Sequence, residues 1–248
     1  MSRQTSLDEL WKSAPLTDRV FSSRQLSGLP EAARRYVEHA IVEGTPLASA
    51  VRLRMHGEIK LKRWCPFSAE QVISWKRGMI WNAVVRMHAM PIRGGDSFVD
   101  GHGAMRWKLF GIVPIINASG LDLDRSAAGR VNIESVWLPS VLCGDEVSWT
   151  ESGTSSPHAR FNAHSETAEI DFLVDEIGRL KSVSMPRWGN PNGSEFRCTN
   201  FGGFVEQERR FGGYTIPTRM RVGWYFGSER FESEGEFYRV MIDDAAYR

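Results

Sequence analysis

The segment VDGHG holds the polar pair most suggestive of chemistry, Asp100 and His102. Two residues that are two positions apart share one face of an extended chain, so the carboxylate could orient the imidazole, or the two could bind a metal ion. The same letters also suit a tight turn, in which Gly101 and Gly103 take positive φ angles and Asp100 bonds its own backbone. The residues alone leave the catalytic and the structural interpretation open.

Glu134 is a second candidate acid or base. It lies in RVNIESVWL, residues 130–138, whose apolar residues alternate as in a β-strand. A glutamate beside so much apolar surface can have a raised pKa and act as a general acid or base. It can equally face solvent or pair with an arginine such as Arg130 or Arg106.

Arginines next to aromatic residues are the third kind of candidate. Arg187 precedes Trp188, and Arg219 and Arg221 alternate with apolar residues near Trp224. Such cations can hold a carboxylate or phosphate group, although on an outward face they are ordinary solvated strand residues, which is the preferred interpretation for Arg221. The residues expected to bind a ligand are Trp107, Trp137, Arg187, Trp188, Met220 and Trp224.

Motifs of other enzyme classes are absent from the sequence. It has no GxSxG, no HExxH, no GxGxxG after a strand-like run and no GxxxxGK[ST]. Its six histidines show no dense ligand spacing, so neither a metal nor a cofactor is expected. Three scattered cysteines without a CxxC pair argue against a disulfide framework.

Composition narrows the class of protein. The 248 residues carry a formal net charge of +1, so nucleic acid is not an expected partner. No apolar run is long enough for a signal sequence or for a membrane helix, which needs about 18 residues, so no integral membrane segment and a cytoplasmic location are expected. Oligomeric state cannot be predicted from these features.

The elements that must position these residues are mostly strands. GGYTIPTRMRVGWYFG, residues 212–227, places Met220, Val222 and Trp224 on one face and arginines on the other. Similar runs are expected to form about ten or more strands joined by turns at RGGD, DGHG, GNPNGS, FGGY and SEGE. The runs cover residues 51–64, 79–90, 97–101, 104–111, 130–138, 146–151, 159–165, 168–176, 180–188, 203–213, 216–227 and 236–244.

The expected fold is mainly β, a large curved antiparallel meander or half-barrel with N-terminal helices as cover. Helices are expected at residues 7–14, 17–26 and 29–44. Residues 1–28 are predicted to be a helical extension, and residues 29–248 a single antiparallel β domain with a leading helix.

Several blocks resemble a family of uncharacterised bacterial and archaeal proteins known only as a domain of unknown function. They are LPEAARRYVEHA, FVDGHGAMRWKLFGIVPIINASG, DRSAAGRVNIESVWLPSVL, SVSMPRWG and FGGYTIPTRMRVGW, and the resemblance runs from about Leu29 to the end. Members of that family with an N-terminal membrane helix differ from this chain. GGYTIPTRMRV is more distantly similar to half-barrel carriers of lipoproteins or lipids, which implies a curved sheet and helical lid around an apolar cavity.

These features support three hypotheses. The first is binding of an apolar or amphiphilic small molecule in an aromatic-lined cavity, with an arginine at any anionic end. The second is an enzyme of the isomerase, cyclase or hydrolyase type that acts on a hydrophobic substrate in the same cavity through Asp100, His102 or Glu134. The third is an interaction module, which would show an exposed apolar patch.

Overall fold

One antiparallel sheet forms the body of the protein in a computed structural model that describes residues 5–88, 90–193 and 195–248. Residues 1–4 of the predicted extension, Ala89 of a predicted strand and Ser194 of a predicted turn lie outside the described residues. Thirteen strands are found in the described part: β1 (Ala50–Lys60), β2 (Trp64–Ser74), β3 (Gly78–Met87), β4 (Met90–Val99), β5 (His102–Leu109), β6 (Val113–Ser119), β7 (Ser148–Glu151), β8 (Pro157–Ala163), β9 (Glu166–Val174), β10 (Leu180–Gly189), β11 (Arg197–Phe211), β12 (Tyr214–Trp224) and β13 (Glu236–Tyr247).

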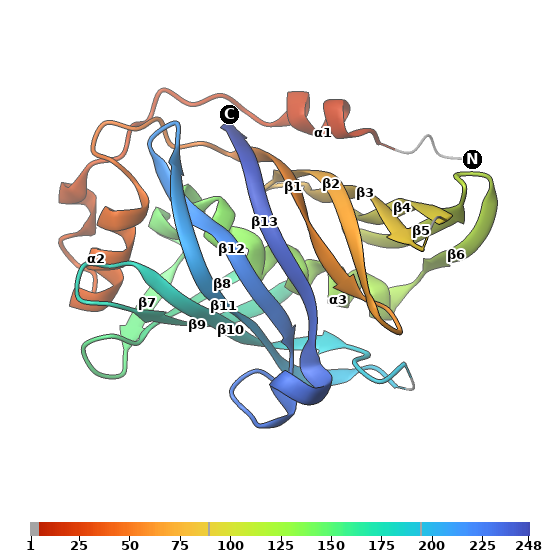
Figure 1. The fold of residues 1–248 in the computed structure, drawn as a ribbon. Coiled ribbons are helices and arrows are strands. Elements are labelled where there is room, and N and C mark those ends of the chain that lie inside the picture. Colours follow the sequence, from red (N-terminus) through yellow and green to blue (C-terminus); the bar gives the residue numbers. More distant parts are fainter. Residues whose placement is uncertain (1–4, 89, 194) are drawn as a thin grey trace.

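The first and last strands of the chain, β1 and β13, pair in the middle of this sheet (Figure 1). The strand order is β6-β5-β4-β3-β2-β1-β13-β12-β11-β10-β9-β8-β7, so the chain runs outward from β1 to the β6 edge and returns from the β7 edge to β13. Among the described residues β6 and β7 each pair with one neighbour only, so the two edges of the sheet do not meet. The expected mainly β, curved antiparallel fold is confirmed.

The segment that joins the two edges crosses the concave side of the sheet. It consists of α3 (Leu121–Ile133) and two short 3-10 helices, η2 (Glu134–Trp137) and η3 (Pro139–Cys143). α3 packs against β10, β5, β9 and β4, and Figure 1 shows the sheet curling around it.

The strand predicted over residues 130–138 is therefore wrong. This segment is buried on all sides, so its apolar residues are not confined to one helical face. A short apolar run of this kind does not distinguish a strand from a buried helix. The residues that indicate a helix lie upstream, since Asp122 and Asp124 are in the first turn of α3. Their negative charges interact favourably with the partial positive charge at the helix N-terminus.

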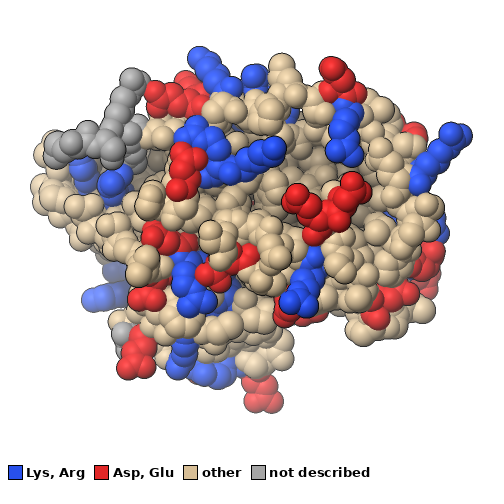
Figure 2. Space-filling view, turned by 180° about the vertical axis from the view of Figure 1, so that it is seen from behind, with Lys and Arg blue, Asp and Glu red and all other residues tan. Residues whose placement is uncertain are grey.

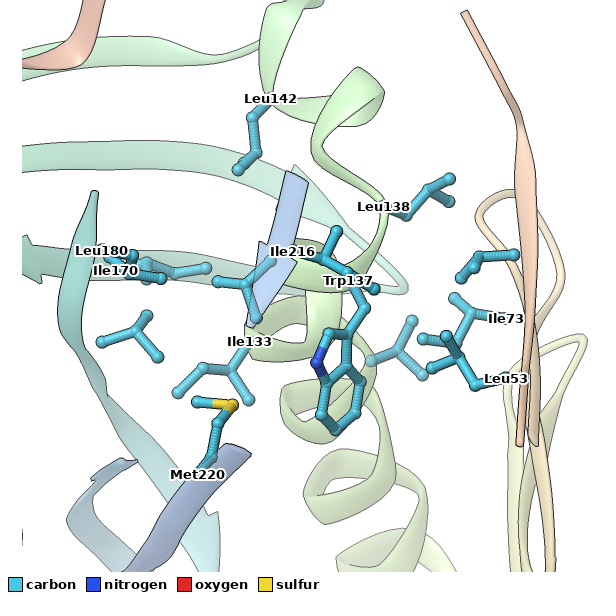
Figure 3. Close-up of a cluster of buried hydrophobic side chains, with 14 of the residues drawn as sticks. Leu53, Ile73, Ile133, Trp137, Leu138, Leu142, Ile170, Leu180, Ile216 and Met220 are labelled. Carbon is cyan, nitrogen blue, oxygen red and sulfur yellow. The ribbon is translucent and has the colours of Figure 1, made fainter. Parts of the chain in front are cut away.

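Trp137 is central to the hydrophobic core. Figure 3 shows it between Leu53 and Ile73 of β1 and β2 on one side and Ile216 and Met220 of β12 on the other. Its indole nitrogen donates a hydrogen bond to the carbonyl oxygen of Pro217 at 3.1 Å, which fixes the ring orientation. This core ties the crossing segment to both halves of the sheet.

The N-terminal helices cover other surfaces. α1 (Leu7–Ser13) packs through Leu10 on Val72 and Ile80, on the face of β2 and β3 opposite to α3. α2 (Glu31–Ala40) packs against β7, β12 and η3, where Tyr36 contacts Trp149 and Phe172. The helix predicted over residues 17–26 is reduced to a short 3-10 helix, η1 (Ser23–Leu26).

Three further features follow from the described residues. None of their helices has the length and apolar character required to cross a membrane. All three cysteines are free. After β12 the chain makes a short π-helical turn, η4 (Phe231–Gly235), before β13.

Gly94 and Gly95 lie inside β4, so the turn predicted at RGGD is wrong. A Cβ atom on Gly95 would lie 1.9 Å from the carbonyl oxygen of Trp81, and one on Gly94 would lie 2.1 Å from that of Arg106. Glycine is needed here because the neighbouring strands approach closely, not because the chain reverses.

We expect Gly95→Ala to lower the free energy of unfolding by about 1–3 kcal/mol, because the added methyl group must push β3 away. Gly28→Ala is the matched control, since nothing lies within 4 Å of its would-be Cβ. Denaturant unfolding of both variants checks this. Equal stability of the two would contradict the close approach of β3 and β4.

Candidate functional site

A partly enclosed cavity of about 340 Å³ lies between α3 and the concave face of the sheet. Its wall is mainly apolar, as in pockets that bind small organic ligands. The apolar and aromatic residues that line it include Ile59, Met79, Trp81, Met105, Leu123, Ile133, Trp137, Phe201, Met220, Val222, Trp224 and Phe237. They come from both halves of the sheet and from α3.

Arg130 joins two carboxylates in the cavity wall. Its Nε donates to Glu134 Oε1 at 2.7 Å, and its Nη1 donates to Asp96 Oδ2 at 3.0 Å. Gln71 Nε2 donates to the other oxygen of Glu134 at 2.5 Å. Glu134 is thus held by two donors, and the predicted alternative of pairing with Arg130 is confirmed.

The elements explain why these groups meet. Arg130 and Glu134 are four residues apart on consecutive helical turns, which brings their side chains to one face. Asp96 follows the close approach at Gly95 and accepts a hydrogen bond from Trp107 Nε1 at 3.3 Å. Burial raises the pKa of Asp96 despite the opposing charge of Arg130. Removing any one of Asp96, Arg130 and Glu134 would therefore leave a desolvated charge without its partner, which destabilises the folded protein.

Arg187 of β10 is a buried cation with a different environment. Its Nε and Nη2 donate to the carbonyl oxygen of Ser126 at 3.1 and 3.0 Å. Its guanidinium carbon lies 4.5 Å from the Phe201 ring centre and 5.2 Å from that of Trp224. The residue is only 9% exposed, and no carboxylate among the described residues forms an ion pair with it.

The environment of Arg187 lowers the pKa of its guanidinium group. Burial, together with the nearby positive charge of Arg130, lowers the pKa to about 9. The charges of Glu134 and Asp96 oppose this shift only in part, and the guanidinium has no directly paired carboxylate among the described residues. An incoming anion would supply such a partner, so Arg187 is the strongest candidate for a ligand contact.

Trp81 is a buried aromatic residue of the cavity wall. Its indole nitrogen is buried and makes no hydrogen bond with the described residues. Its ring lies 5.7 Å from the Trp107 ring and 5.2 Å from the Arg130 guanidinium carbon. Trp81 thus lines the cavity with its ring, next to Tyr238.

Five of the nine predicted site residues line this cavity: Glu134, Trp137, Arg187, Met220 and Trp224. Trp107 lies just behind the wall, where it contacts Asp96 and Trp81.

Asp100 and His102 lie outside the cavity, Asp100 in the turn between β4 and β5 and His102 as the first residue of β5. Asp100 has a φ of 52° and Gly101 a φ of 89°. Arg77 Nε donates to Asp100 Oδ1 at 2.9 Å and lowers its pKa. Within the described residues, no group of three His, Cys, Asp or Glu side chains could hold a metal ion. The geometry therefore favours the structural interpretation of VDGHG.

Trp188 also lies outside the cavity. Strand alternation turns it away from Arg187, and its Nε1 donates to Asp122 at 2.9 Å. The Arg125 guanidinium carbon lies 4.3 Å from its ring centre. Trp188 thus fixes the beginning of α3 and does not touch the cavity.

Sequence reasoning missed Asp96, Trp81 and Phe201 as site residues and considered Arg130 only as a partner of Glu134. The two glycines before Asp96 predict a turn at RGGD, whereas the structure places Asp96 inside β4. Trp81 and Phe201 lie on strands like many other aromatics, and nothing local marks them as cavity residues. The one local indication of the site is the Gly94–Gly95 pair before Asp96, because glycines inside a strand often mark a close approach of the backbone.

The family described as "Family of unknown function (DUF6920)" matches residues 27–247. The family resemblance expected from about Leu29 onward is thereby confirmed. A search of curated proteins found no match.

Three solved structures are similar in fold. An outer membrane lipoprotein-sorting protein domain from Vibrio parahaemolyticus has a TM-score of 0.41 and 6% identity, covering 81% of this chain and 86% of the other. A DUF1329 family protein from Desulfovibrio piger has a TM-score of 0.44 and 12% identity, covering 81% and 86%. The LolA superfamily protein NE2245 from Nitrosomonas europaea has a TM-score of 0.43 and 9% identity, covering 88% and 92%.

Proposed function

This chain belongs to DUF6920, a family of unknown function, and we propose from its own residues that it binds an amphiphilic small molecule with an anionic group. The apolar part of the ligand occupies the cavity between α3 and the sheet, and Arg187 binds the anionic end.

Arg187 is the observation that carries this proposal. A buried guanidinium normally has a carboxylate partner, because an uncompensated buried charge is costly. Arg130, in the same wall, has two such partners, whereas Arg187 has only a backbone carbonyl, a longer hydroxyl contact and two aromatic rings. A carboxylate or phosphate ligand would complete its environment through charge-assisted hydrogen bonds.

The size of the cavity limits the apolar part of the ligand. A dry apolar cavity of roughly 150 Å³ accommodates benzene. At about 340 Å³, this cavity has room for about twice that volume, which corresponds to roughly a dozen non-hydrogen atoms on the same scale. Aromatic rings and Met220 along the wall suit a chain or a planar body.

Native mass spectrometry of the freshly purified protein, with analysis of its organic extract, tests for a resident ligand. Dodecanoate and 1-dodecanol are then compared as matched probes by calorimetric titration. We expect an anionic amphiphile in the extract and tighter binding of dodecanoate than of the alcohol, because only dodecanoate can pair with Arg187. Absence of a resident ligand together with no binding of either probe would reject the proposal.

An enzyme acting in the same cavity is the second candidate function. The buried carboxyl group of Glu134 and the half-buried one of Asp96 line the cavity, and the raised pKa of Asp96 is a property of general acids. Glu134→Gln separates the candidates: an enzyme would lose conversion of the extracted ligand and keep its affinity.

A cytoplasmic location remains a prediction, which cell fractionation tests.

A further inference from the structure

The hairpin of β5 and β6 exposes an unusual number of large apolar side chains. Ile112 is 77% exposed and Leu121, at the start of α3, is 83% exposed. Within residues 110–121 the exposed large apolar residues are Phe110, Ile112, Val113, Ile115, Ile116 and Leu121, which we call the apolar hairpin. Isolated exposed apolar residues are common, but a cluster of this kind marks an interaction surface.

The position of β6 explains why these side chains stay in water. β6 is an edge strand, and its main contacts are with β5 and the start of α3. Six of its seven residues are exposed, so apolar side chains project from both of its faces. Edge strands usually carry charges that prevent unwanted contacts, whereas this one carries none.

Four cations lie beside the apolar hairpin, on the face of β3 to β5 that points away from the cavity: Arg86, Arg93, Arg106 and Lys108. Arg93 is paired in register with Lys108, and Arg106 with Gly95 of the same neighbouring strand. None of the four forms an ion pair with a described residue.

The acidic residues that adjoin this region have other partners. Glu70 and Asp243 line the same outer groove as Arg93 and contact Arg52 and His56. Asp122 and Asp124, at the start of α3, accept hydrogen bonds from Trp188 and from the Gly103 backbone N–H.

Between residues 86 and 121 the sequence contains only two acidic residues, Asp96 and Asp100. Asp96 faces the cavity and pairs with Arg130, and Asp100 pairs with Arg77. Elsewhere the signs are mixed, since Figure 2 shows acidic and basic side chains interspersed over the face it presents.

We propose that this end of the protein docks on an anionic lipid bilayer. The apolar hairpin enters the boundary between headgroups and acyl chains, and the four cations contact the lipid phosphates. Apolar side chains flanked by basic ones are what interfacial binding requires. Met105 of β5 and Leu123 of α3 line the cavity, so the docking surface adjoins its wall, but docking does not depend on any cavity ligand.

A second copy of the chain fits this surface less well. Pairing β6 with β6 would bring the four cations of each copy towards those of the other, and β6 itself carries no acidic residue that could offset them. Pro114 lacks the N–H group that a strand ladder needs. A bilayer would bury the apolar side chains on both faces of β6 at once, whereas pairing with another strand would cover only its edge.

Co-sedimentation with vesicles tests the docking, using equimolar phosphatidylcholine and phosphatidylglycerol and, in parallel, phosphatidylcholine alone. We expect the full chain to bind the anionic vesicles and to bind the neutral ones much more weakly. Ile112→Ser with Ile115→Ser should lower the partition coefficient at least about ten-fold, because two side chains no longer leave water. Arg93→Gln with Lys108→Gln should lower it by about five-fold per charge, on anionic vesicles only.

Ile177→Ser is the matched control, because Ile177 is 59% exposed in the turn between β9 and β10. It should bind as the unchanged protein does. Circular dichroism checks that the serine variants fold; should the hairpin variant fail to fold, the charge variant decides. No binding to anionic vesicles, or equal binding by the hairpin and control variants, overturns the proposal. A dimer that disperses in the hairpin variant, without vesicle binding, would overturn it in favour of a second copy.

Discussion

Arg187→Met is expected to weaken binding of dodecanoate by at least about 100-fold, because it removes the charge-assisted hydrogen bonds to the carboxylate. Methionine keeps much of the side-chain length and the apolar contact with Phe201 and Trp224. Binding of 1-dodecanol should change little, since the alcohol does not need the cation. Calorimetric titration of both probes measures the two effects.

The same substitution should not destabilise the unliganded protein. The lowered pKa of Arg187 means that the charged form is less favourable in the folded chain than in the unfolded chain. Replacing it with an apolar residue removes that cost, at the loss of its hydrogen bonds to Ser126. We expect a free energy of unfolding that is unchanged or higher by about 1–2 kcal/mol.

Arg219→Met is the matched control for ligand binding. Arg219 lies on β12 and pairs with Glu206 at 2.8 Å on the exposed side of the sheet. It should bind dodecanoate as the unchanged protein does. If Arg187→Met retains full affinity for dodecanoate while Arg219→Met loses it, the anionic end lies outside the cavity and the proposed site is wrong.

Arg130→Met should have the largest effect on stability, a loss of about 3–5 kcal/mol in the free energy of unfolding. It leaves Asp96 and Glu134 in the cavity wall without their shared cation. For a chain of this size the melting temperature should fall by about 2–4 °C for each kcal/mol. Denaturant and thermal unfolding measure both quantities.

The loss should depend on pH in a defined direction. Burial already raises the pKa of Asp96, and removal of Arg130 takes away the charge that opposes this rise. A carboxyl group whose pKa is raised in the folded state favours folding when it is protonated, and this contribution disappears as the pH rises through that pKa. The destabilisation of Arg130→Met should therefore be smaller near pH 5 than near pH 8.

Two further variants test whether unpaired buried charge causes the loss of stability in Arg130→Met. Adding Asp96→Asn and Glu134→Gln to Arg130→Met should recover much of the lost stability, because no buried charge remains unpaired. Arg125→Met, on the same helix, removes a more exposed pair with Glu166 and should cost about 1 kcal/mol or less. A small, pH-independent loss for Arg130→Met would contradict the coupling of the three side chains.

Local pattern was sufficient for most of the strands. The alternation in VRLRMHGEIKLKRW predicts β1, and the alternation around Met220 and Trp224 predicts β12 with those residues facing inward. The turn at Asp100 and Gly101 was also readable, because glycine and aspartate favour positive φ for reasons confined to a few residues. Arg187 could be nominated because it is a cation next to an aromatic residue and ahead of a Gly/Pro/Asn loop, although strand alternation places Trp188 on the other face.

Tertiary structure decided which of these strands meet and what fills the space between them. The pairing of β1 with β13 joins Met55 to Ile242, and no local feature of either strand encodes that choice. The cluster of Asp96, Arg130 and Glu134 joins β4 to a buried helix that sequence reasoning took for a strand. A side-chain period is set within one segment, whereas burial on all sides and the close approach of strands depend on partners distant in the chain. The sequence by itself therefore determined most of the strands and their inward faces. Only the tertiary structure determined β2 and β6, the helix α3, the cavity and the buried Arg187, which has no directly paired carboxylate.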